Sequence, residues 1–118
     1  MKFKIFLAVL LLSNFSLLAF AQQLNQQQYD QQVNALYSTL LNQQELLNRE
    51  LDGKKEINKI IQISCDYVEN LAGLEKLSLE NITLKEAKIE AEHARKLIQD
   101  FELSFKDLGT SSAKSCSK

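Results

Sequence analysis

Proline and tryptophan are absent from the 118 residues, and glycine occurs only three times, at positions 53, 73 and 109. Proline removes a backbone N–H donor and glycine weakens a helix, so a chain with almost none of either contains few points where a helix must stop. The scarcity of proline and glycine excludes an architecture of many short helices separated by helix-breaking residues. The sequence therefore predicts an all-α protein built from long helices.

Histidine is also scarce, because His93 is the only one. A metal site at His93 would need a second histidine or a cysteine nearby. Glu90 is close in the sequence, but His93 and Glu90 together are too small a ligand set. A nucleophile such as Ser64 or Ser104 would need His93 as its base, yet the helix faces that carry these residues are not aimed at one another. The carboxylates are scattered and no glycine-rich phosphate loop exists. We therefore expect no enzymatic activity, no metal and no cofactor, and we interpret His93 as a surface residue.

The sequence also lacks a large excess of positive or negative charge, since it contains 14 basic and 15 acidic residues. A nearly balanced chain has no electrostatic footprint for nucleic acid. It also shows no basic amphipathic helix for an anionic membrane surface. We therefore expect a partner that is neither a nucleic acid nor a membrane.

Residues 1–21 have the pattern of a secretory signal peptide. Lys2 and Lys4 give a positive start, residues 5–12 form an unbroken apolar run, and Ala19-Phe20-Ala21 is a small-x-small cleavage site. The apolar stretch as a whole contains serine and asparagine and is shorter than the roughly 20 apolar residues of a membrane span. We predict cleavage after Ala21, export to the periplasm or the extracellular space, and no membrane anchor after processing.

The mature chain would begin at Gln22 and contain 97 residues, enough for one domain with one core. Loss of Lys2 and Lys4 leaves 12 basic against 15 acidic residues, a net charge of −3. A domain of this size needs additional support from a disulfide or a partner. We assign residues 22–109 to a single helical domain and residues 110–118 to a flexible tail rich in serine and lysine.

Apolar residues at three- and four-residue spacing predict three helices. The first runs from about Asn25 to Leu51. Asn25 and Gln28 form a weak capping box at its start. Gly53 ends the helix, because glycine accepts the left-handed conformation common at helix C-termini.

The second helix spans about 54–79 and continues through Gly73, because a glycine inside a helix costs only about 1 kcal/mol relative to alanine. The third helix begins at a capping box formed by Thr83 and Glu86 and ends at Gly109. Its apolar residues keep heptad spacing over three repeats. They are Leu84, Ala87, Ala91, Ala94, Ile98, Phe101, Phe105 and Leu108.

Three helices of about 25 residues, joined by short connections, predict an up-down-up three-helix bundle. Antiparallel order gathers large apolar residues around Phe101 and Phe105 at one end, where the bundle should be thicker. At the other end, small alanines of the third helix face larger side chains. The alternative is a long helical hairpin plus a third helix whose apolar seam pairs two copies into a homodimer.

Cys65 and Cys116 are the only cysteines, and two cysteines in an exported chain are usually paired. Cys65 lies about 16 Å from the start of the second helix, beside which the third helix ends. The residues from Gly109 to Cys116 reach about 23 Å when extended, enough to return to Cys65. We predict an intramolecular Cys65–Cys116 disulfide that tethers the C-terminal tail.

Asn81-Ile82-Thr83 matches an N-glycosylation acceptor in a predicted loop. Thr83 already has a structural reason for its position as a helix cap. We therefore favour a structural role for this tripeptide over modification.

The leading hypothesis for function is an exported, non-enzymatic helical protein that binds one other protein, as an inhibitor or immunity-type protein does. The first alternative is a chaperone-like binder of many clients, which would use an exposed apolar groove at the end that carries Phe101 and Phe105. The second is a carrier of a small apolar ligand, for which a balanced core leaves little room. The architecture by itself carries little weight in choosing among them.

Overall fold

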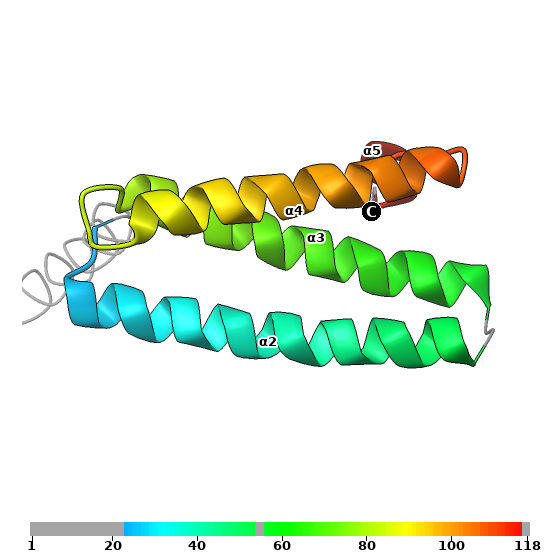
Figure 1. The fold of residues 1–118 in the computed structure, drawn as a ribbon, viewed down its shortest axis with the longest axis horizontal. Coiled ribbons are helices and arrows are strands. Elements are labelled where there is room, and N and C mark those ends of the chain that lie inside the picture. The colour runs from blue at the N-terminus through cyan, green and yellow to red at the C-terminus, as the bar shows by residue number, and fades with distance from the viewer. Residues whose placement is uncertain (1–22, 54–55, 117–118) are drawn as a thin grey trace, which may run out of the picture.

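The computed structural model describes residues 23–53 and 56–116, and no strand occurs within these ranges. The predicted signal peptide lies outside the described residues. The described residues form α2 (Gln26–Asp52), α3 (Ile57–Glu80), α4 (Ala87–Asp107) and the short α5 (Ser112–Ser115). The three long helices pack together in the predicted up-down-up order (Figure 1), which confirms the predicted fold. No helix in these two ranges is both long enough and apolar enough to cross a membrane.

α3 is the central helix, because it packs against both α2 and α4. Figure 1 shows that α2 and α4 diverge from the start of α2 toward the end of α4. The bundle therefore has a closed end, where α2 and α4 begin and α3 ends, and an open end opposite. The buried core residues lie mainly toward the closed end. One cluster contains Tyr29, Val33 and Leu40 of α2, Tyr67, Leu71 and Leu74 of α3, and Ala87 and Ala94 of α4.

The closed end is fixed by buried hydrogen bonds between helices. The hydroxyl groups of Tyr29 and Ser78 lie 2.9 Å apart and are fully enclosed. Asn81 is 5% exposed, its Oδ1 accepts from the Leu24 N–H at 2.8 Å, and its Nδ2 donates to the Leu77 carbonyl at 2.8 Å. The asparagine of the glycosylation motif thus has a structural role in the folded chain.

The predicted start of α2 is confirmed, because Asn25 is the N-cap and forms a complete capping box with Gln28. Gly53 is the C-cap, but its φ of −77° is right-handed. The expected left-handed ending is therefore wrong at this position. α3 runs without interruption through Gly73, as predicted.

The predicted capping box at Thr83 and Glu86 is wrong. α4 begins at Ala87, and Glu86 is an N-cap without a side-chain hydrogen bond, at a left-handed φ of 70°. The reason is tertiary, because Gln26 of α2 accepts from the Lys85 N–H at 2.9 Å and also donates to the Lys85 carbonyl at 3.3 Å. These bonds hold the chain in a turn where the local pattern favoured a helix.

The C-terminal tail is attached to α3 by the Cys65–Cys116 disulfide, which confirms that prediction. Gly109 has a left-handed φ of 79° just beyond α4, as expected for a helix-ending glycine. Ser111 caps α5 by accepting from the Lys114 N–H. The described part of the tail therefore has more local structure than its composition predicts.

Candidate functional site

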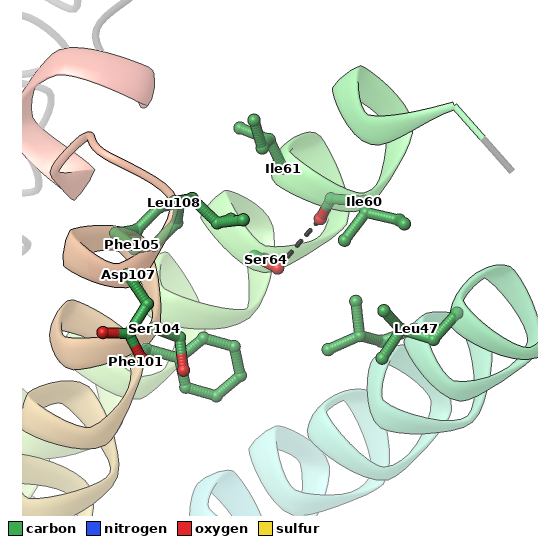
Figure 2. Close-up of a pocket in the computed structure, with 10 residues that line it drawn as sticks. Leu47, Ile60, Ile61, Ser64, Phe101, Ser104, Phe105, Asp107 and Leu108 are labelled. Atoms are coloured by element: carbon green, nitrogen blue, oxygen red, sulfur yellow. Dashed lines mark hydrogen bonds between the residues drawn. The ribbon is translucent and has the colours of Figure 1, made fainter. Parts of the chain in front are cut away.

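The open end contains an apolar groove of about 410 Å³ between the last turns of α2, the first turns of α3 and the last turns of α4 (Figure 2). Ten residues line this groove: Leu47, Leu51, Ile60, Ile61, Ser64, Phe101, Ser104, Phe105, Asp107 and Leu108. Seven of these ten residues are aliphatic or aromatic. The lining is therefore dominated by side chains that prefer to be out of water.

Each wall of the groove comes from one helix. Figure 2 shows Leu47 of α2 and Phe101 of α4 on opposite sides of the groove, with Ile60 of α3 above Leu47 in this view. The three helices bring these side chains together because the apolar faces of α2 and α4 both pack against α3. Since α2 and α4 diverge here, their stripes do not meet each other, and the space between them stays open.

The two residues that the sequence singles out as a partner surface, Phe101 and Phe105, both line the groove but differ in burial. Phe105 is 2% exposed and lies at its base. Phe101 is half-buried and its ring stacks on Tyr67, with ring centroids 4.8 Å apart. The rim is more exposed, because Leu51 and Leu108 are 52% and 53% exposed. The prediction of partner binding itself stays a prediction.

The two serine hydroxyls of the groove are already occupied by bonds within their own helices, and Asp107 is its only charged side chain. The Ser64 hydroxyl donates to the Ile60 carbonyl at 2.8 Å, and the Ser104 hydroxyl donates to the Asp100 carbonyl at 3.2 Å. Neither serine has His93 as a hydrogen-bond partner. The groove therefore offers apolar contact and shape, with very few free hydrogen-bonding groups.

His93 belongs to a separate polar cluster that joins α2 to α4. The Tyr37 hydroxyl donates to the Glu90 carboxylate, and the His93 Nδ1 lies 3.5 Å from the same hydroxyl. Burial raises the pKa of Tyr37, and the hydrogen bond to Glu90 raises it further. His93 is exposed, as the sequence predicts, and the part played by Tyr37 was missed because Tyr37 lies more than 50 residues from both Glu90 and His93.

Glu50 is a second polar residue that sequence reasoning missed. It is 8% exposed, and its Oε1 lies 3.2 Å from the Lys59 Nζ, whereas its Oε2 has no hydrogen-bond partner. Glu50 does not line the groove. Across residues 23–53 and 56–116, no group of three or more histidine, cysteine or acidic side chains is arranged to hold a metal ion.

No protein-family model matches this chain, and neither a curated protein nor a solved structure is similar enough to it to count as a match.

Proposed function

We propose that this chain is an exported, non-enzymatic protein that binds another protein through the groove. The observation that supports this most directly is the exposure of Leu51 and Leu108 on the α2 and α4 walls of one apolar groove, with half-buried Phe101 also on the α4 wall. Concave apolar sites of this kind accept the anchoring side chains of a partner. The exposed Leu46 and Ile89, in contrast, do not line the groove.

Export is part of this proposal. The Cys65–Cys116 disulfide fits an oxidising compartment, because thiols are kept reduced in most cytosols. The charged start, apolar run and Ala19-Phe20-Ala21 site of the sequence support removal of residues 1–21. The intact mass of the exported protein tests this, and a retained N-terminal segment would contradict it.

A second candidate function, transport of a small apolar ligand, is supported by the volume of the groove. At about 410 Å³ it falls within the range of about 300–1,000 Å³ that is typical of small-molecule sites. A balanced core predicted no such space. The exposed rim favours a protein partner over a ligand, since a small ligand would leave Leu51 and Leu108 in water.

The experiment is a pull-down from envelope extract with the mature protein and two matched double variants. Leu51→Gln with Leu108→Gln changes the groove, whereas Leu46→Gln with Ile89→Gln removes two exposed apolar side chains elsewhere. We expect the groove variant to lose captured protein and the control variant to retain it.

The pattern of bands then distinguishes the modes of binding. One stoichiometric band indicates an inhibitor with a single partner, and many bands indicate a chaperone-like binder. Capture that is equal for the wild type and the groove variant would show that the groove is not the binding site.

A further inference from the structure

Building on the proposed function, we infer that the occupant of the groove is an amphipathic helix of a partner protein, with basic residues along the edge that faces α4. The shape of the groove fits a helix. From Phe101 to Leu108 the α4 wall extends over seven residues, about 10 Å of helix. Leu47 and Leu51 cover one turn of the opposite wall. A wall of this length matches a helix that presents apolar anchors at i, i+3 or i+4, and i+7.

The hydrogen-bonding needs of the occupant's backbone also favour a helix. An extended peptide needs hydrogen-bond partners for its N–H and C=O groups, because leaving them buried and unpaired is unfavourable. The groove provides few, since the hydroxyls of Ser64 and Ser104 already donate within their own helices. A helix pairs its own backbone groups internally and needs only apolar contact from the groove. The lining therefore selects a helix over an extended segment.

The charge along the α4 edge of the groove favours a basic occupant. Asp107 lines the groove, and Asp100 and Ser104 precede it on the same face of α4 at four- and three-residue spacing. No lysine or arginine lines the groove, and no ion pair within the described residues involves Asp100 or Asp107. The α4 edge is therefore acidic, and lysine or arginine on the occupant would complement it.

The same charge distribution disfavours a second copy of this chain as the occupant. A symmetric dimer brings the same surface patch of both subunits together. Through the groove, it would place the acidic edge with Asp100 and Asp107 of one copy close to that of the other. A cationic helix from a different protein avoids this repulsion.

The test uses three synthetic 18-residue peptides with a fluorescent label, measured by anisotropy against the mature protein. The first contains leucine at helical spacing with lysine elsewhere, the second replaces lysine by glutamate, and the third is the leucine–lysine peptide with two central prolines. We expect the leucine–lysine helix to bind roughly tenfold more tightly than either of the others.

Two further variants separate the acidic edge from general charge. Asp100→Asn with Asp107→Asn should weaken binding of the leucine–lysine helix by roughly threefold to tenfold. Glu69→Gln with Glu92→Gln changes net charge equally at exposed positions outside the groove and should leave affinity unchanged. Leu51→Gln with Leu108→Gln should weaken binding of the peptide in the same experiment.

Equal affinity for the three peptides, or equal loss in the two charge variants, would overturn the inference. If the groove variant loses its protein partner in the pull-down but no helical peptide binds, the inference is wrong and the proposed function stands. If both measurements are insensitive to the groove, both are wrong. A wild-type dimer in sedimentation that Leu51→Gln with Leu108→Gln abolishes would assign the groove to a second copy and overturn the inference.

Discussion

The closed and open ends of this bundle contain the same three helices but pack them differently. At the closed end α4 presents Ala87, Ala91 and Ala94, and these small side chains allow Tyr29 of α2 and Leu74 of α3 to be fully enclosed. At the open end α4 presents Phe101, Phe105 and Leu108, and α2 lies farther from α4 there (Figure 1). Small residues opposite large ones close a three-helix core, whereas large residues on every helix leave a groove.

Hydrogen bonds that connect different helices are also more numerous at the closed end than at the open end. The closed end contains the Tyr29–Ser78 hydroxyl pair, the two bonds of Asn81 and the attachment of Gln26 to Lys85. Between the walls of the groove, no comparable bond joins α2 to α4 among the described residues. At the open end, the Glu50–Lys59 ion pair joins α2 to α3, Ser112 donates to the Glu102 carboxylate of α4, and the disulfide joins the tail to α3, but none of these links bridges the two walls of the groove. We therefore expect stability to be concentrated at the closed end and binding at the open end.

The largest contrast is expected from truncation of apolar side chains. Leu71→Ala removes a fully buried side chain and should lower the free energy of unfolding by about 2–5 kcal/mol. Phe101→Ala should cost about 1–3 kcal/mol, less than full burial would imply, because the half-buried ring retains contact with water. Leu51→Ala should cost below about 0.5 kcal/mol. Urea unfolding measures all three, and equal losses would remove the distinction between the ends.

The disulfide is expected to contribute the next largest effect. Cys65 and Cys116 are 51 positions apart, and replacing both by serine should lower stability by about 2–4 kcal/mol in the chain-entropy model. Hydrogen exchange should increase most in α5 and in the first turns of α3, which the bond holds together. As a control, a reducing agent should destabilise the wild type but not the double serine variant. No change in the wild type would mean that the tether adds nothing to the fold.

High pH should also destabilise the protein. Burial raises the pKa of Tyr29 and of Tyr67 above the ordinary value of 10.0. The fold favours the neutral form of each buried tyrosine, and burial of that neutral side chain contributes to stability. Because the pKa is raised in the folded state, this contribution is fully present below pH 10 and is lost as pH rises through the folded-state pKa. Between the unfolded-state pKa and the folded-state pKa, each tyrosine should lower the free energy of unfolding by roughly 1.4 kcal/mol per pH unit.

Thermal unfolding between pH 9 and pH 12 measures this dependence, with ultraviolet titration to follow tyrosine ionisation. Tyr29→Phe serves as the control, because it removes one ionising group and should make the decline with pH less steep. Stability that stays constant up to pH 12 would contradict the burial of these hydroxyls.

The smallest expected effect comes from relieving the backbone at Glu86. Its φ of 70° is unfavourable for a residue with a Cβ, and glycine accepts it without that penalty. Glu86→Gly should stabilise the fold by about 0.5–1 kcal/mol, with thermal unfolding as the measurement. Glu86→Ala removes the same charge but keeps the Cβ, so it should give no such gain. A loss of stability in the glycine variant would indicate that the Glu86 side chain is needed at the closed end.

The sequence by itself determined the elements and their order. The absence of proline, the apolar spacing and the Asn25 capping box are local signals, and a helix is a local structure. Two cysteines in a chain with an export signal were enough to predict the pairing of Cys65 with Cys116. The location of apolar residues near Phe101 and Phe105 followed from the antiparallel order of the helices.

The tertiary structure alone decided where α4 begins and where the bundle opens. Thr83 and Glu86 carry a local capping pattern, but the bonds from Gln26, 59 positions away, override it at Lys85. The Tyr37–Glu90 and Leu24–Asn81 bonds likewise join residues more than 50 positions apart, and no local pattern signals them. Side-chain volumes along one helix do not specify how far its neighbours diverge. The groove depends on that divergence, which is set only when all three apolar faces pack together.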